Sequence, residues 1–370
     1  MQILITGANG FIGKNLLARL EENPGFDTNT FTRSDTTSSL LEMVNNADAI
    51  FHLAGVNRPD TVDDFDSGNK MLTELLCKAV KESGKKNHII FASSVQANLD
   101  NHYGRSKKDA EEVLLEFCSQ SGCPVSIFRL PNVFGKWCRP EYNSVVATFC
   151  HHIANDMPVE IHDASKTLRL VYIDDVVSAF IRRLTSFSSG SAFIDIHPEY
   201  TISLSELAET LYRFRKSRDS LLIDGVGKGL QRALYATYLS YLEPENFHFA
   251  LHGNNDDRGT FVEILKTEHS GQFSFFTAKK GVTRGGHYHH TKNEKFVVVQ
   301  GKAEFNFRNI DTNQRYSVSV SADKPEIVET IPGWAHDITN IGENELIVFL
   351  WANEIFNPER PDTIGVSLDG

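Results

Sequence analysis

The stretch Met1–Gly13, which reads MQILITGANGFIG, decides the fold of the first half of the chain. It contains a short apolar strand, Ile3–Thr6, and opens a helix over Phe11–Leu20 whose apolar residues share one face. Between them, the glycines at positions 7, 10 and 13 have G-x-x-G-x-x-G spacing. In such a unit the first makes the tight turn, the second lets the backbone approach a pyrophosphate, and the third packs the helix on the strand. The stretch predicts a dinucleotide site at the helix N-terminus, with a plain tight turn as the alternative.

Further along the chain, apolar segments of strand length alternate with helical patterns. The predicted strands are Asp27–Thr32, Ala49–Leu53, His88–Ala92 and Val125–Leu130, and the predicted helices are Asn69–Ser83 and Tyr103–Gln120. Strands that alternate with helices indicate a parallel sheet covered by helices on both faces. The first part of the chain is therefore expected to be an α/β, Rossmann-like, doubly wound domain.

The sequence pattern changes after Asp256, where helical patterns give way to short strands separated by turn residues. The predicted strands are Phe261–Leu265, Phe273–Thr277, Lys295–Val299, Ala303–Phe307, Arg315–Val320, Ile327–Thr330 and Leu346–Trp351. This pattern predicts an all-β sandwich or barrel. The preceding stretch Leu204–Leu242 reads as helical, so we place the domain boundary after it, giving domains 1–243 and 244–370.

Composition limits the class of protein. The 370 residues predict two domains, and 41% hydrophobic with 23% charged residues is ordinary for a globular chain. The net charge of −11 argues against a general attraction to nucleic acid or to an anionic membrane. No apolar run is long enough for a membrane span, and the N-terminus lacks the features of a signal peptide. The five cysteines form no CxxC pair, which indicates a reduced, cytoplasmic protein.

The second predicted strand ends at Thr30–Ser34, where a dinucleotide site usually places an acidic residue on the ribose 2′-hydroxyl. The segment instead offers hydroxyl groups and the cation Arg33. A cation and hydroxyls suit a 2′-phosphate, so the sequence favours NADPH over NADH as the cofactor. The alternative is that Arg33 is a solvated loop charge.

A candidate catalytic group follows. Tyr103 and Lys107 are four residues apart in a predicted helix and therefore share a face. Lys107 is expected to lower the pKa of Tyr103 and to bind the nicotinamide ribose. Tyr103 would exchange a proton with a substrate oxygen during hydride transfer, and Ser94, at a predicted strand end, would hydrogen-bond the same oxygen. The three residues predict a site for redox chemistry at a carbonyl group.

With these motifs, the N-terminal part resembles the extended short-chain dehydrogenase/reductase family, in its sugar-nucleotide branch. The resemblance also rests on His52–Gly55, Asn69, Arg129–Gly135, Asn143–Val145 and Val171–Val176. It implies a nucleotide-sugar substrate held by Asn132, Asn143, Ser144 and Val145. It implies cofactor contacts from Gly7, Asn9, Gly10, Phe11, Ile12, Gly13, Arg33, Leu53, Ala54, Gly55, Asn69, Tyr103, Lys107 and Pro131.

One departure from the family narrows the chemistry. Dehydratases of this family carry Asp-Glu directly after the catalytic hydroxyl, whereas Ser94 is followed by Val95 and Gln96. The departure disfavours 4,6-dehydration and favours simple hydride transfer to a ketone.

The β domain contains a candidate metal centre. His287 and His289 are two residues apart, so in a strand they point to the same side. Glu294 lies a hairpin turn further on, and His336 could come from a neighbouring strand. Three imidazoles and a carboxylate suit a divalent cation such as Zn²⁺. The alternative is a pair of surface histidines.

The spacing of Gly281, the two histidines, Glu294 and Gly301 resembles the cupin signature. The resemblance implies a jelly-roll barrel in which the metal ligands are His287, His289, Glu294 and His336. The segments Asp256–Phe261 and Arg284–His287 resemble cupin epimerases that act on 4-keto-6-deoxy nucleotide sugars, in which the histidine at position 287 is the base in metal-free members. An imidazole that ligates a metal cannot also take a proton. The candidate bases here are therefore His290, Lys292 and Tyr288, and the metal is expected to be either catalytic or structural.

Taken together, the chain resembles the CapF-type family of bifunctional capsular polysaccharide biosynthesis enzymes. The resemblance implies that the cupin domain epimerises C-3 of a UDP-2-acetamido-2,6-dideoxy-4-hexulose. The first domain then reduces the C-4 ketone with NADPH to UDP-2-acetamido-2,6-dideoxy-L-talose, a precursor of UDP-N-acetyl-L-fucosamine. It also implies a homodimer.

Three other hypotheses stay open at the level of sequence. One is a 4-epimerase that retains NAD and carries the cupin as an accessory, which Arg33 disfavours. Another is a non-catalytic sensor of NADP and sugar, which would not need the set Ser94, Tyr103 and Lys107. The third treats the β domain as a dimerisation module only.

Overall fold

The computed structural model describes residues 1–58, 61, 65–186, 189–251, 253–256, 259–262, 265–267, 271–354 and 359–368. The chain folds into two compact units. Unit 1 comprises Met1–Ser144 and Leu168–Ile202, and unit 2 comprises Val145–Thr167 and Ser203–Gly370. Within the described residues, no helix has the length and apolar character that crossing a bilayer requires.

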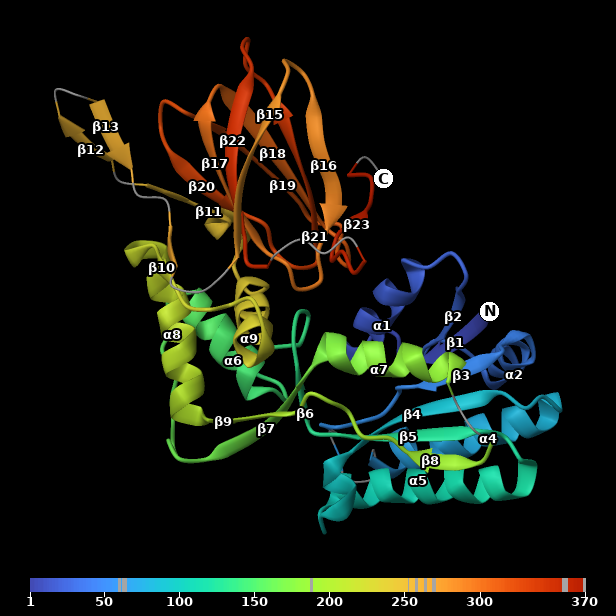
Figure 1. Cartoon of the computed structure of the whole chain (residues 1–370). Coiled ribbons are helices and arrows are strands. Elements are labelled where there is room, and N and C mark those ends of the chain that lie inside the picture. Colours follow the sequence, from blue (N-terminus) through green and yellow to red (C-terminus); the bar gives the residue numbers. More distant parts are fainter. Residues whose placement is uncertain are drawn as a thin grey trace. The chain divides into compact units, whose positions relative to one another are not determined.

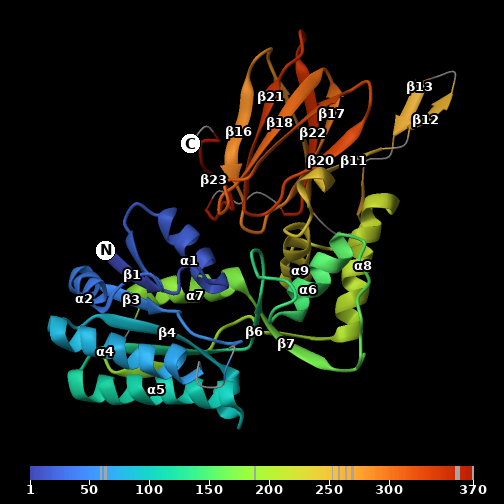
Figure 2. The ribbon, with the colours of Figure 1, turned by 180° about the vertical axis from the view of Figure 1, so that it is seen from behind.

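Unit 1 is built on a six-stranded parallel sheet in the order β2-β1-β3-β4-β5-β8. Its strands are β1 (Gln2–Thr6), β2 (Asp27–Phe31), β3 (Ala49–His52), β4 (His88–Ser94), β5 (Val125–Leu130) and β8 (Ser191–Phe193). Its helices include α1 (Phe11–Glu21), α2 (Thr37–Asn46), α4 (Leu72–Ser83), α5 (His102–Ser121) and α7 (Ile173–Thr185). Helices α1 and α7 cover one face and α4 and α5 the other (Figures 1 and 2). The predicted doubly wound α/β fold is confirmed.

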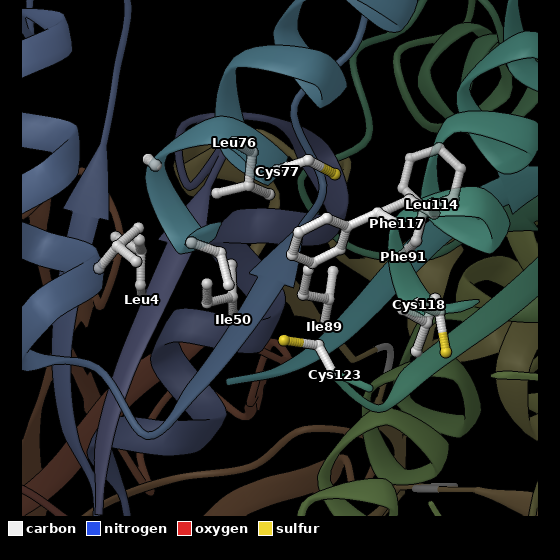
Figure 3. Close-up of a cluster of buried hydrophobic side chains, with 14 of the residues drawn as sticks. Leu4, Ile50, Leu76, Cys77, Ile89, Phe91, Leu114, Phe117, Cys118 and Cys123 are labelled. Carbon is white, nitrogen blue, oxygen red and sulfur yellow. The ribbon is translucent and has the colours of Figure 1, made fainter. Parts of the chain in front are cut away.

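The core of this sheet explains why the segments fold as they do. Leu4, Ile50 and Ile89 of successive strands are fully buried, as are Leu76 of α4 and Leu114 of α5. Figure 3 shows these strand and helix side chains meeting in one apolar layer. Parallel strands covered on both faces need such continuous apolar runs, which is why they could be located from sequence.

The strand order places the candidate site. The chain leaves β1 for β2 on one side and returns to β3 on the other, so the carboxyl ends of β1 and β3 flank a switch point in the sheet. Ligands of open α/β sheets bind at such points. A separate three-stranded sheet, β6 (Asn132–Phe134), β7 (Thr167–Tyr172) and β9 (Tyr200–Ser203), continues from the end of β5.

Unit 2 contains two five-stranded sheets, in the orders β11-β20-β17-β22-β15 and β19-β18-β21-β16-β23. The first comprises β11 (His248–Ala250), β20 (Glu326–Glu329), β17 (Glu294–Gln300), β22 (Leu346–Ala352) and β15 (Gln272–Ala278). The second comprises β19 (Arg315–Ser321), β18 (Lys302–Asn309), β21 (Trp334–Asn340), β16 (Thr283–Tyr288) and β23 (Ile364–Gly365). All their pairings are antiparallel, and Phe296 and Phe305 bring the sheets into contact with ring centroids 5.7 Å apart. The predicted all-β jelly-roll class is confirmed. The predicted strand Phe261–Leu265 is partly described, as β13 (Gly259–Val262).

Unit 2 also contains α6 (Val145–Ala154), α8 (Leu204–Ser220) and α9 (Gly229–Leu239). The division into compact units therefore differs from the predicted domain boundary after residue 243. The physical reason is an ion pair between Arg218 of α8 and Glu329 of β20, a carboxylate that also pairs with Lys295. Arg218 in addition donates to the Asn246 carbonyl at 2.6 Å. The predicted helical stretch Leu204–Leu242 is two helices, separated by the short strand β10 (Leu222–Ile223) and a glycine-containing loop.

The imidazole of His52, at the end of β3, ties three elements of unit 1 together. It hydrogen-bonds the hydroxyl of Thr6 at 2.8 Å through Nδ1 and that of Thr73 at 2.9 Å through Nε2. Burial, assisted by the charge of Lys107, lowers the pKa of His52 to about 3. The ring is therefore neutral in the folded protein at neutral pH.

This burial predicts an acid-dependent loss of stability. Below its unfolded pKa of about 6.5 the unfolded chain binds a proton that the folded ring refuses, so stability falls between pH 6.5 and about 3. We expect the wild type to lose about 1.4 kcal/mol more per pH unit than His52→Gln in this window. Thermal unfolding of both proteins between pH 7 and 5 measures the difference, and parallel slopes would contradict it.

Candidate functional site

The glycine turn of unit 1 forms the floor of the candidate dinucleotide site. Gly7 has a φ of +75°, and the Gly10 amide donates to the Gly7 carbonyl at 3.0 Å. A Cβ at Gly13 would lie 2.2 Å from that same carbonyl oxygen, so only glycine lets α1 pack this closely on the turn. Helix α1 has no side-chain cap and no acidic residue in its first turn. Its free amides therefore fit the pyrophosphate of a dinucleotide.

The loop after β3 lies against this turn. A Cβ at Gly7 would lie 2.5 Å from the Ala54 amide nitrogen, and that amide donates to the Thr6 hydroxyl at 3.3 Å. The Asn69 side chain, in the π-helical turn Asp66–Met71, accepts from the Val56 amide at 3.0 Å and donates to the Val56 carbonyl at 2.9 Å. The structure thus brings the predicted cofactor residues 53–55 and 69 to the same sheet edge as the glycines.

The end of β2 would meet the adenosine ribose. Arg33 is exposed and, among the described residues, forms no ion pair. Asp35, which the sequence pattern did not indicate, accepts from the backbone and hydroxyl of Thr32 at 2.7 and 2.8 Å. These hydrogen bonds lower the pKa of Asp35. The nearby carboxylate is therefore engaged with its own loop, and Arg33 keeps a free guanidinium for a phosphate.

The predicted catalytic residues lie at the carboxyl end of β4. Lys107 Nζ donates to the Ala92 carbonyl at 2.9 Å and lies 4.8 Å from the centre of the Phe91 ring. Burial lowers the pKa of Lys107 to about 8, although Glu111 opposes the shift. Burial also raises the pKa of Tyr103, partly offset by its hydrogen bond with Ser94. Burial is the larger effect on the phenol of Tyr103, and the expectation that Lys107 lowers the pKa of Tyr103 stays a prediction.

A charged cluster that the sequence pattern did not indicate lies behind these residues. Glu111, one helical turn after Lys107, accepts from the Ser93 hydroxyl at 2.5 Å. It also forms an ion pair with Arg129 of β5, with Arg129 Nη2 at 2.5 Å from Oε2. The i,i+4 spacing of Lys107 and Glu111 was the available signal in the sequence.

The predicted substrate residues are distributed over three segments. Asn132 follows β5 and the predicted cofactor residue Pro131, and its side chain donates to the Arg169 carbonyl at 3.0 Å, which holds β6 beside β7. Asn143 is exposed, and Ser144 hydrogen-bonds the Cys138 thiol, whose pKa burial raises to about 11. Val145 is the first residue of α6 and belongs to unit 2.

The four predicted metal ligands meet inside the β domain. One ligand atom from each of His287, His289, Glu294 and His336 lies within 4.8 Å of the others. His287 and His336 are register partners on β16 and β21, whereas Glu294 begins β17 in the opposite sheet. His289 lies one residue beyond the end of β16, at the start of the loop that follows this strand.

The donor set fits a divalent cation. Among the residues that the structure describes, neither ring nitrogen of the buried His336 has a hydrogen-bond partner, and its Nε2 is 3.7 Å from Glu294. Burial, then the neighbouring His336 and His289, lower the pKa of His287 to about 3, so that ring is neutral and offers a lone pair. Burial would raise the pKa of Glu294, but the surrounding imidazoles and Lys292 hold it well below 4.5. Neutral imidazoles around a carboxylate are ligands for zinc.

Asp362 orients this cluster, and no sequence signal pointed to it. Its carbonyl oxygen accepts from Nδ1 of His289, which leaves Nε2 of that ring directed at Glu294, 3.2 Å away. Its carboxylate accepts from the backbone amides of His290, Thr291 and Lys292 at 2.9, 2.6 and 2.7 Å. The candidate bases His290 and Lys292 are therefore buried and held beside the cluster, with Lys292 Nζ 3.2 Å from Glu294. The ring of Tyr288 lies 5.4 Å from that of His290.

The fold and site of unit 1 define a nicotinamide-dependent enzyme of the short-chain dehydrogenase/reductase class. Residues 3–196 match the family model described as the NAD dependent epimerase/dehydratase family, and residues 254–364 match the polysaccharide biosynthesis C-terminal domain. The chain belongs to the NAD-dependent epimerase/dehydratase family, in the CapF-type branch that joins these two domains.

Three relatives illustrate this membership. The UDP-2-acetamido-2,6-beta-L-arabino-hexul-4-ose reductase of Pseudomonas aeruginosa is 53% identical over 100% of this chain and 99% of its own length. The crystal structure of the capsular polysaccharide assembling protein CapF from Staphylococcus aureus has 38% identity and a TM-score of 0.67, over 99% of this chain and all of that one. The spore coat polysaccharide biosynthesis protein SpsL of Bacillus subtilis is 27% identical, over 30% of this chain and 79% of its own length.

Proposed function

We propose that the chain is a bifunctional nucleotide-sugar enzyme. The β domain, as a cupin, epimerises C-3 of a UDP-2-acetamido-2,6-dideoxy-4-hexulose, and unit 1 reduces the C-4 ketone with NADPH to UDP-2-acetamido-2,6-dideoxy-L-talose. The observation that carries the proposal is the set Ser94, Tyr103 and Lys107 beside the glycine turn, in a chain 53% identical over its full length to a UDP-hexulose reductase.

The reductive step uses two hydroxyl groups and one ammonium. NADPH, when bound, supplies the hydride that reaches C-4. Ser94 and Tyr103 donate hydrogen bonds to the ketone oxygen, and as C-4 gains the hydride, Tyr103 transfers its phenolic proton to that oxygen. The raised pKa of Tyr103 keeps the phenol protonated before the reaction, as a proton donor needs. The Lys107 ammonium stabilises the resulting phenolate, and the free Arg33 supports NADPH over NADH.

The epimerisation requires only that the proton at C-3 be acidic. Zn²⁺ would be held by His287, His289, Glu294 and His336. The cation would either polarise the ketone oxygen or serve only to stabilise the folded barrel. A base beside the cluster, His290, Lys292 or Tyr288, removes the proton from C-3, and the carbon receives a proton on the opposite face. Reduction of the adjacent ketone then fixes the new configuration.

Exposed aromatic side chains and buried cysteines bear on the oligomeric state and the cellular location of the enzyme. We propose a homodimer, supported by the exposed rings of Phe273 and Phe275 on β15, which lie against the partly buried ring of Phe349 on β22 and which a second copy would cover. We also place the enzyme in the cytoplasm, in capsule precursor synthesis on the route to UDP-N-acetyl-L-fucosamine. All five cysteines are buried and outside any disulfide, which suits a reducing compartment.

Cofactor stoichiometry tests the proposed reductase. The 4-keto sugar nucleotide is added to enzyme with excess NADPH, and absorbance at the nicotinamide band is followed. One NADPH should be oxidised per sugar reduced. Interconversion of 4-hydroxyl epimers of the sugar nucleotide without net oxidation would instead identify a 4-epimerase that retains its cofactor, and binding of the 4-keto sugar with neither epimerisation nor reduction would identify a sensor.

A further inference from the structure

Glu111 is a buried acid to which the proposed mechanism gives no role. Its side chain is 2% exposed, on the face of α5 that packs against β4 and β5. Oε1 accepts from the Ser93 hydroxyl at 2.5 Å and from Arg129 Nε at 2.9 Å, and Oε2 accepts from Nη2 of Arg129 at 2.5 Å. Ser93 and Arg129 are themselves register partners on β4 and β5. Both oxygens are therefore held by short, charge-assisted bonds from two strands.

The same carboxylate belongs to the surroundings of Lys107. Lys107 interacts electrostatically with Glu111 of its own helix and with the neutral ring of His52 from β3, and it donates to the Ala92 carbonyl of β4. Tyr103 precedes Lys107 by four residues on the same helix. Asn69 contributes an uncharged amide, with Gly55 between the two side chains. Burial works against the ammonium form of Lys107, and the negative charge of Glu111 works in its favour.

We propose that Glu111 is a positioning residue for the reductase site, which keeps Lys107 cationic and anchors the end of β4 that presents Ser94. Arg129 has the complementary task of pairing with the buried carboxylate of Glu111. The inference rests on the proposed role of Lys107 at the nicotinamide ribose. Three charged side chains thus form a row that alternates in sign: the cation Lys107 and the anion Glu111 on α5, and the cation Arg129 on β5.

The test compares Glu111→Gln with a matched control, Glu112→Gln, whose carboxylate is 64% exposed on the same helix in an i,i+4 pair with Lys108. The dissociation constant of NADPH is measured by fluorescence titration from pH 6.5 to 9.5, without any sugar. In wild type and Glu112→Gln, affinity should decline with a midpoint near the pKa of Lys107. In Glu111→Gln the midpoint should move down by about one pH unit, so that affinity near pH 8 falls about fivefold and the loss approaches about tenfold at higher pH.

A purely structural role would weaken binding equally at every pH and leave the midpoint in place, and this result would overturn the proposal. Arg129→Met provides an independent variant, since an unpaired buried Glu111 takes up a proton and loses its charge. It should shift the midpoint in the same direction, whereas Ser93→Ala, which keeps the charge, should not. Melting temperatures confirm that each variant is folded. If the wild type binds NADPH but reduces no 4-keto sugar, the proposed function fails while the midpoints still decide the role of Glu111.

Discussion

Tyr103→Phe is expected to lower kcat for ketone reduction by about 10²- to 10⁴-fold, the usual contribution of a positioned proton donor. The substitution removes the phenolic hydroxyl, the group that would deliver the proton to the C-4 oxygen. It keeps the aromatic ring, which packs 5.9 Å from that of Phe65, so the local structure should persist. The affinity for NADPH should change by no more than about twofold, because Lys107 and the glycine turn remain.

Two controls make this result interpretable. Tyr212→Phe removes a hydroxyl from an exposed tyrosine of α8 and should leave kcat unchanged. Proton exchange at C-3, which we assign to the β domain, should continue in Tyr103→Phe at the wild-type rate. A variant that keeps more than a tenth of the wild-type kcat would show that another group donates the proton.

His336→Asn is expected to abolish stoichiometric zinc binding and to lower cation affinity by more than about 100-fold, since outer partners of metal ligands alone contribute 10- to 100-fold. Within the described part of the chain neither nitrogen of this buried imidazole has a hydrogen-bond partner, so a cation is the group that satisfies it best. The measurements are metal content after dialysis and the rate of deuterium uptake at C-3 in heavy water. His162→Asn, at an exposed histidine, is the matched control.

The two readouts also assign the role of the cation. If it polarises the ketone, zinc and exchange should be lost together while the barrel stays folded. If it only holds the barrel, the melting temperature should fall and exchange by the remaining folded protein should persist. Full zinc content and full exchange in His336→Asn would contradict the assignment of the metal centre.

Much of unit 1 could be predicted because short sequence patterns specify its strands, its glycine turn and its helices. A buried parallel strand is a continuous apolar run, and Ala49–His52 or Val125–Leu130 can be located from that alone. The glycine turn and the Tyr103–Lys107 pair are likewise short-range patterns on one strand end and one helix face.

The elements that escaped prediction depend on longer-range packing. Strand β16 reads TRGGHY, with two glycines at positive φ and a register shift at Gly285, so it lacks the β-branched pattern of a strand. The helical stretch expected over Leu204–Leu242 contains glycines at positions 225, 227 and 229 that mark a loop, but its first helix already ends before Leu221, which has a φ of +58°. Asp362 lies 73 residues from His289, and no local spacing could pair them.

One reaction mixture tests the central claim that a single chain performs both steps. The 4-keto substrate is converted in heavy water with protiated NADPH, and the product is examined by proton NMR. The account predicts deuterium at C-3, from solvent, and protium at C-4, from the cofactor. Protium retained at C-3 or solvent deuterium at C-4 would contradict it.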